Sequence, residues 1–222
     1  MNHSNHTSWV DILKQIVVPL LATMVFALFQ GAIAYFLMEA DVPPDWRLLG
    51  YGLAGIVLFG GIYLRWMRRK EHFKLSWPLV GISLIVVLVL SVLDRGVAQI
   101  WSSFTGIGQE LSLEVMDRPG PSLIILIVSI LMLPILEELF FRGVLLGFDF
   151  VRRNRPLLSI LVTSLCFSSI HLSLYFPLES VPAVVGAFIF SIALSTLYLR
   201  TESLLLVILM HILYNSLSFI SI

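Results

Sequence analysis

Residues 119–142 read PGPSLIILIVSILMLPILEELFFR. The stretch opens with an uncharged run that ends at Leu136, and two adjacent acids and an arginine follow that run. A helix needs roughly 20 apolar residues to cross a lipid bilayer, so this run is almost long enough by itself. An ionised side chain near the bilayer centre costs about 2.5–3.5 kcal/mol and has to face protein or trapped water. The stretch therefore predicts a membrane-spanning helix whose second half faces the interior of a helical bundle.

Other uncharged runs of similar length lie on both sides of this one, at 15–38, 48–64, 75–93, 156–178, 180–199 and 203–222. They are continuous, whereas the strands of a membrane barrel alternate in polarity, and a helix satisfies its own backbone hydrogen bonds in lipid. We therefore predict an all-α polytopic membrane protein, a bundle of about seven transmembrane helices. Residues 1–118 would supply the first three helices and residues 119–222 the other four, within one membrane domain.

Composition excludes several other classes of protein. Hydrophobic residues make up 58% of the 222 residues and charged residues only 13%, against about 25% charged in a typical soluble domain. The 14 Lys and Arg residues balance the 14 Asp and Glu residues, so we expect no nucleic-acid partner. Cys166 is the single cysteine, so an internal disulfide is excluded.

A small set of polar side chains lies within or directly after three of the last four runs, the fourth, the fifth and the seventh: Glu137, Glu138, Arg142, His171, His211 and Asn215. Intramembrane ionisable residues are rare and usually functional, so these are the candidate site residues. If each run forms a full-length helix, they lie in one layer near the bilayer middle, at 1.5 Å of rise per residue. Outside this set, we expect Asp94 to lie at a helix end beside Arg95.

Helical spacing predicts which way the side chains of this set face. Glu138 and Arg142 are four residues apart and can pair on one face, whereas Glu137 is turned about 100° from Glu138. His211 and Asn215 also share a face. Pro134 lacks the N–H that would bond to the Ile130 carbonyl, so we expect a kink one turn before the glutamates. The neighbouring aromatic residues are expected to serve in packing: Phe140, Phe141, Phe148 and Phe150.

These side chain types suit peptide hydrolysis. A partly desolvated carboxylate can act as the base that activates water, and a histidine can help to hold that water. A second histidine and an asparagine amide can donate to the oxyanion that forms on the attacked carbonyl. Neither a Gly-x-Ser-x-Gly elbow nor a His-Glu-x-x-His zinc helix occurs in the sequence. A buried network without chemistry and a small transporter remain as alternatives.

Three motifs occur in order along the second half of the chain. Residues 137–142 read EExxxR, residues 167–171 read FxxxH, and residues 211–215 read HxxxN. In this order, on successive hydrophobic segments, they resemble the CPBP intramembrane endopeptidases, the CAAX-processing and bacteriocin-processing (Abi) family. The resemblance covers about 121–215, and the first three segments carry no matching motif.

The resemblance implies a role for each motif residue. Glu137 would be the general base and His171 would share the water, while His211 and Asn215 would form the oxyanion hole. Glu138 and Arg142 would be a supporting pair. No cofactor is required in this mechanism, but Glu137, His171 and His211 with a water would also suit a three-ligand catalytic zinc. Asn is an unusual zinc ligand, which favours the metal-free reading.

The resemblance also implies a membrane-associated protein or peptide as the substrate, with membrane lipid around the enzyme. The small size and short loops favour a bacterial source. A non-catalytic membrane partner, such as an immunity protein that keeps the motifs, is the alternative function. The oligomeric state is left open by the sequence.

Loop charges predict how the chain is oriented in the cell membrane. The loops at 65–74 and 149–155 are rich in Lys and Arg, whereas the loops at 39–47 and 94–118 are rich in Asp and Glu. Basic loops stay in the cytoplasm. We therefore predict a cytoplasmic N-terminus, seven crossings and an external C-terminus.

Reporter fusions test this orientation directly. Fusions at Arg69 and Arg153 should report a cytoplasmic location, and a fusion after Ile222 should report an external one, because positive charge is retained on the cytoplasmic side. An external signal at Arg153 would contradict the predicted topology.

Overall fold

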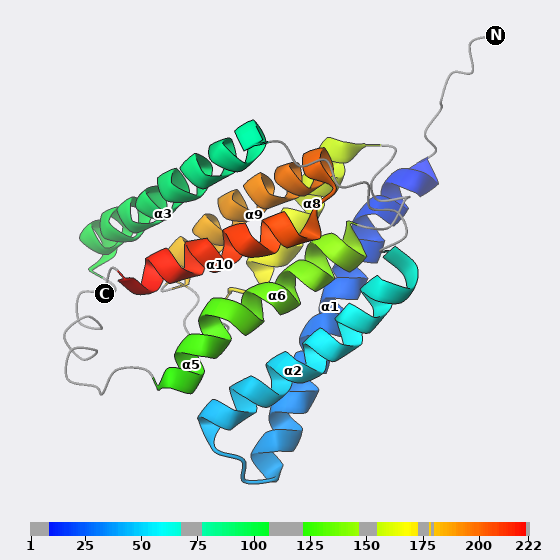
Figure 1. Cartoon of the computed structure of the whole chain (residues 1–222), viewed down its shortest axis with the longest axis vertical. Helices are drawn as coiled ribbons and strands as arrows, with labels where there is room; N and C mark the ends of the chain where they lie inside the picture. The colour runs from blue at the N-terminus through cyan, green and yellow to red at the C-terminus, as the bar shows by residue number, and fades with distance from the viewer. Residues whose placement is uncertain are drawn as a thin grey trace.

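The computed structural model describes residues 9–67, 77–106, 122–146, 155–172, 178 and 180–220. In these parts of the chain the regular structure is entirely helical and contains no strand. Figure 1 shows the resulting bundle of long helices. The prediction of an all-α polytopic bundle is confirmed. Of the predicted aromatic packing residues, Phe148 and Phe150 lie outside the described residues.

Most of the predicted runs form one helix each: α1 (Trp9–Glu39), α2 (Pro44–Ile62), α3 (Trp77–Thr105), α8 (Pro156–Ser169), α9 (Val181–Thr201) and α10 (Leu204–Ile220). A π-helical turn, η1 (Tyr63–Met67), extends α2. The run before the glutamates forms one continuous rod of four pieces: α5 (Leu123–Ile127), η3 (Val128–Met132), α6 (Leu133–Glu138) and η4 (Leu139–Leu145), of which η3 and η4 are π-helical.

Five of these helical segments are long and apolar enough to cross a membrane: Trp9–Glu39, Pro44–Arg65, Trp77–Thr105, Leu123–Leu145 and Val181–Thr201. Two shorter apolar helices, Pro156–Ser169 and Leu204–Ser218, accompany them. At 1.5 Å per residue, the 14 residues of α8 rise only about 21 Å, which is less than the roughly 30 Å of hydrocarbon. The expectation of a full-length fifth helix is therefore wrong.

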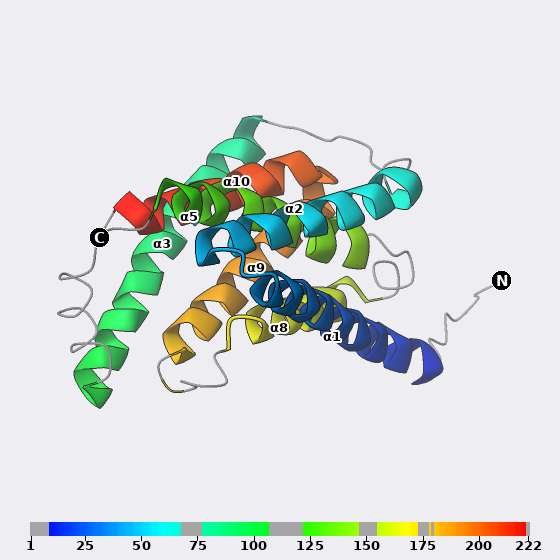
Figure 2. The same ribbon diagram turned by 90° about the horizontal axis from the view of Figure 1, so that it is seen from below.

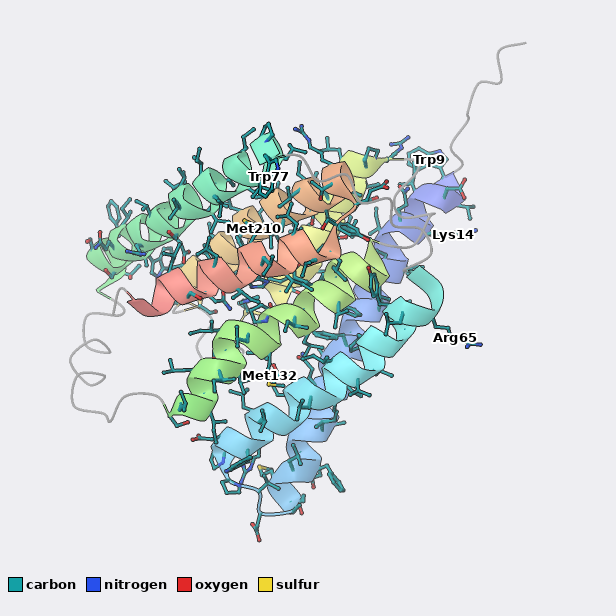
Figure 3. All side chains as sticks on the ribbon, viewed as in Figure 1. Trp9, Lys14, Arg65, Trp77, Met132 and Met210 are labelled. Atoms are coloured by element: carbon teal, nitrogen blue, oxygen red, sulfur yellow. The ribbon has the colours of Figure 1, made fainter. Side chains whose placement is uncertain are left out.

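The helices pack so that the rod of four pieces lies at the centre. Its α6 portion contacts both α2 and α10, while α9 packs between α8 and α3. The first helix lies beside α2 and α8. Figures 1 and 2 show that α1 begins and α10 ends at opposite ends of the bundle. Lys14 near the start of α1 and Arg65 near the end of α2 lie at the same end (Figure 3).

Aromatic rings fill the space between four of these elements. The ring of Phe26 on α1 stacks on Phe140 of η4 with centroids 4.2 Å apart, and Phe59 of α2 lies 5.1 Å from Phe140. Phe141 contacts Phe167 of α8 at 5.1 Å. Phe140 and Phe141 are both buried, which agrees with the packing role expected of them. Long runs of exposed Leu, Val and Ile on α1 and α3 form the surface that faces lipid.

Close contact between α2 and α6 depends on a glycine. A Cβ on Gly55 would lie 2.5 Å from Cδ1 of Leu136, a side chain that is itself fully buried. Leu136 directly precedes Glu137 and Glu138, so the close packing of α6 on α2 fixes the depth and rotation of both glutamates.

Gly55→Ala should therefore destabilise the protein by about 1–3 kcal/mol through overpacking. Gly61→Ala on the same helix is the matched control, because nothing lies within 4 Å of its Cβ position. Thermal unfolding of both variants in one detergent measures the difference. Equal melting temperatures for the two variants would show that α6 does not need this close approach.

Candidate active site

One part of the candidate site is formed where the backbone hydrogen bonding of the central rod is interrupted, at the end of η3. The N–H of Leu133 bonds to the carbonyl of Val128, five residues earlier, so the next donor in this register is residue 134. Pro134 has no N–H to give, and the carbonyl of Ser129 is left without that donor. The side-chain amide of Asn215 on α10 donates to this carbonyl at 2.9 Å. The kink expected at Pro134 stays a prediction; the structure shows a π-helical turn just before it, and the carbonyl left open there holds Asn215 in place.

The carboxylate of Glu138 joins two basic side chains. Its Oε1 accepts a hydrogen bond from Nη1 of Arg142 at 2.7 Å and another from Nδ1 of His211 at 2.8 Å. The side chains of Glu138 and Arg142 are both 0% exposed. The structure therefore contains the ion pair expected from their spacing, and it adds His211 as a third member that spacing alone did not indicate.

The guanidinium of Arg142 extends this network to α8 and α9. Its Nη2 donates to the carbonyl of Ser191 at 3.1 Å and to the hydroxyl of the same residue at 2.8 Å. The guanidinium carbon lies 4.9 Å from the centre of the Phe167 ring, within the range of a cation–π contact. One buried cation thus holds together helices that are far apart in the sequence.

Glu137 differs from its neighbour in both surroundings and exposure. Its side chain is 14% exposed, and its Oε2 lies 3.7 Å from Nε2 of His211, which is beyond direct hydrogen-bonding distance. A gap of this size between two polar groups is one that a water molecule can bridge. The two adjacent carboxylates therefore have separate surroundings, as the 100° turn between them predicts.

The structure corrects the expected position of His171. We expected it inside a helix, but α8 ends at Ser169 and His171 lies in the turn that follows. Its backbone N–H bonds to the carbonyl of Ser168, three residues earlier, which tightens the end of the helix. Its Nδ1 donates to the carbonyl of Phe167 at 3.0 Å. In that tautomer the lone pair of Nε2 is available as an acceptor.

The predicted site residues that matter for chemistry line a single cavity of about 300 Å³. Its polar lining comes from five helical elements or their ends: Asp94, Ser129, Glu137, His171, His211, Tyr214, Asn215 and Ser218. Phe167, Phe190 and small alanines complete its wall. The structure thus brings Glu137, His171, His211 and Asn215 together, and places Glu138 and Arg142 buried beside them.

Asp94 is the cavity residue that sequence analysis missed. The uncharged run ends at Leu93, but α3 continues to Thr105, so Asp94 lies about three turns inside the helix and not at its end. It continues the buried face formed by Ser83, Val87 and Ser91, at spacings of four, four and three residues. This spacing indicates that α3 continues past Asp94, whereas the charge of Asp94 by itself favours a helix end there.

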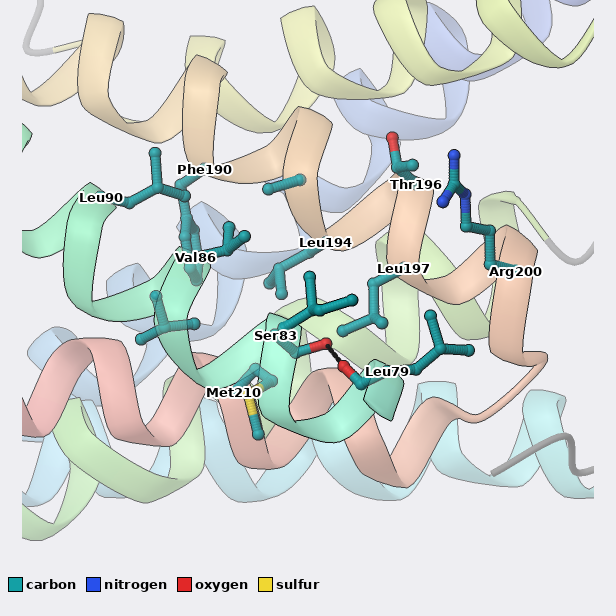
Figure 4. A pocket seen from close by; sticks show the side chains of 13 residues that line it. Leu79, Ser83, Val86, Leu90, Phe190, Leu194, Thr196, Leu197, Arg200 and Met210 are labelled. Atoms are coloured by element: carbon teal, nitrogen blue, oxygen red, sulfur yellow. Dashed lines mark hydrogen bonds between the residues drawn. The ribbon is translucent and has the colours of Figure 1, made fainter. Parts of the chain in front are cut away.

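A second pocket of about 220 Å³ lies between α3 and α9 (Figure 4). Its lining is mostly aliphatic but includes Thr196 and Arg200, and the hydroxyl of Ser83 is engaged with the carbonyl of Leu79 in its own helix at 2.6 Å. Phe190 lines both this pocket and the polar cavity. The apolar pocket therefore adjoins the candidate active site but contributes no catalytic group to it.

The expected zinc ligands are not arranged as a metal site. Among the described residues, no three His, Cys, Asp or Glu side chains are placed to hold a metal ion together. Nδ1 of His211 is engaged with Glu138 and Nδ1 of His171 with a backbone carbonyl, so Nε2 is the ring nitrogen that each could offer to a ligand. Metal dependence itself stays a prediction.

Comparison with known families gives a match to most of the second half of the chain. Residues 119–217 match a family model described as "Type II CAAX prenyl endopeptidase Rce1-like". This span contains all three motifs, and the resemblance to the CPBP family is confirmed over it. Neither the curated proteins nor the solved structures give a match to the chain.

Arg142→Ala should lower both stability and yield. It leaves the buried Glu138 carboxylate without its arginine and removes the bonds to Ser191, and breaking a buried pair typically costs about 3–5 kcal/mol. Glu137→Gln is the matched control, since it keeps the size of a neighbouring side chain that has no comparable ion pair. Melting curves in the same detergent compare the two. If Glu137→Gln melts as early as Arg142→Ala, the two carboxylates have the opposite roles.

Proposed function

We propose that this chain, whose residues 119–217 match the Rce1-like CAAX endopeptidase family, is an intramembrane endopeptidase that uses water activated by Glu137. The observation that carries the proposal is the shared cavity: a carboxylate, two imidazoles and an amide from three separate segments meet there. A family match alone supports a membrane protease, while this cavity supports a specific arrangement of its chemistry.

The reaction begins with a water molecule between Glu137 and the scissile carbonyl. The carboxylate accepts a proton from that water as the water oxygen bonds to the carbonyl carbon. Nε2 of His171 is free to accept the other water hydrogen, because Nδ1 already donates to Phe167. When the tetrahedral intermediate collapses, the carbon–nitrogen bond breaks and Glu137 gives its proton to the leaving amine.

The oxyanion of that intermediate needs donors. One N–H of the Asn215 amide bonds to Ser129, which fixes the orientation of the group and leaves its second N–H for the substrate. His211 donates from Nδ1 to Glu138, so its Nε2 carries a proton only in the imidazolium form. We infer that His211 donates from Nε2 to the oxyanion, while Glu138 holds the ring through Nδ1.

Glu138 and Arg142 hold this arrangement in place. The carboxylate fixes the tautomer and angle of His211, as an acidic partner does in other histidine-based sites. Arg142 in turn fixes the carboxylate and balances its charge. The substrate is a membrane-associated protein or peptide, and the adjoining apolar pocket can receive an apolar part of it.

The test is peptide cleavage by purified protein in lipid nanodiscs. A defined mixture of synthetic peptides is incubated with wild-type and Glu137→Gln protein, and fragments are followed by mass spectrometry. Glu137→Gln should reduce the rate by about 10²–10⁴-fold, the usual contribution of a general base. Glu39→Gln, at the exposed end of α1, is the matched control and should cleave at the wild-type rate.

Two outcomes would contradict this proposal. If wild type and Glu137→Gln leave the mixture equally intact, the chain is a non-catalytic membrane partner. If a strong chelator abolishes cleavage and stoichiometric zinc restores it, the hydrolysis depends on zinc instead of on a metal-free carboxylate.

A further inference from the structure

Asp94 lies in the active-site cavity but belongs to a part of the chain outside the family match. It is on α3, whereas the match begins at residue 119. The same cavity contains Glu137, His171 and Asn215. A side chain from the first half of the chain therefore faces the space in which the proposed reaction takes place.

The structure places the carboxylate of Asp94 firmly. Its Oδ1 lies 2.0 Å from the position that a Cβ on Gly186 would occupy, so the carboxylate fits against α9 only because that residue is glycine. The hydroxyl of Tyr214 on α10 donates a hydrogen bond to the same carboxylate. The Tyr214 ring stacks on Phe190 with centroids 4.1 Å apart. Asp94 is thus held by two helices and is built into the cavity wall.

The contacts that Asp94 makes with Gly186 and Tyr214 do not require its side chain to be negatively charged. A tyrosine hydroxyl needs only one acceptor, which the neutral amide of asparagine would also supply. A charged Asp within a membrane helix is costly, so a charge kept there calls for a partner. Arg95, the next residue, interacts with it electrostatically but directs its guanidinium to the carbonyl of Leu217, at 3.4 Å. Among the described residues that line the cavity, none is a lysine or arginine.

We propose that Asp94 is a specificity-determining residue that binds a lysine or arginine side chain of the peptide substrate beside the scissile bond. This inference rests on the proposed endopeptidase function. A cation that enters with the substrate would meet an open carboxylate whose position is fixed before binding. Such pre-organised, charge-assisted contacts are among the stronger determinants of specificity.

Binding tests the inference without any cleavage. Two short, fluorescein-labelled peptides of leucine and alanine differ only in a central Lys or Gln. Glu137→Gln protein in nanodiscs should bind the Lys peptide about tenfold more tightly than the Gln peptide. Adding Asp94→Asn should abolish this ratio, because asparagine keeps the shape and the acceptor for Tyr214 but removes the charge. Adding Glu39→Gln instead should preserve it. A melting curve confirms that each variant is folded.

Cleavage gives the second readout. In the peptide mixture, sites cut by wild-type protein should be enriched in Lys or Arg at one position, and Asp94→Asn should reduce the Lys-to-Gln ratio of kcat/KM by about tenfold. Cleavage without this enrichment, or a ratio that Asp94→Asn leaves unchanged, would overturn the role of Asp94 while leaving the protease intact. Absence of cleavage together with preferential binding of the Lys peptide would overturn the protease and leave the cation site.

Discussion

The buried triad of Arg142, Glu138 and His211 is the interaction on which the rest of the site depends. A single carboxylate oxygen accepts hydrogen bonds from both basic side chains, and the arginine continues to Ser191 and the Phe167 ring. In lipid, helices gain little from hydrophobic association, so polar contacts and close packing determine how they assemble. The triad supplies such contacts between the central rod, α8, α9 and α10. It also orients the imidazole that faces the cavity.

An unpaired backbone carbonyl in the central rod is the group to which Asn215 binds. The π-helical turn of η3 and the missing N–H of Pro134 leave the Ser129 carbonyl free, and the Asn215 amide fills that place. Unpaired backbone groups are expensive in a membrane, which explains why a side chain from another helix is held there. The position of the Asn215 amide in the proposed mechanism therefore follows from the need to satisfy an unpaired backbone carbonyl of the central rod.

The first half of the chain takes part in the site although it carries none of the motifs. Gly55 on α2 allows α6 to approach closely, and α3 contributes Asp94 to the cavity wall. The motif-bearing half would place the base and the oxyanion donors, while the first half would adjust which substrate fits. This division is consistent with a family match that begins at residue 119, after α3, and contains all three motifs.

The sequence by itself determined the fold class, the helical runs and the six polar candidate residues, because continuous apolar length and costly buried charges are properties of local sequence. The i,i+4 spacing was enough to pair Glu138 with Arg142 and to separate Glu137 from both. Only the tertiary structure decided that His211 completes the pair, that α8 ends before His171, and that Asp94 lies inside the cavity. Contacts between helices distant in the sequence are not contained in the periodicity of any one helix; the spacing along α3 indicates a buried face for Asp94, but not the cavity that it lines.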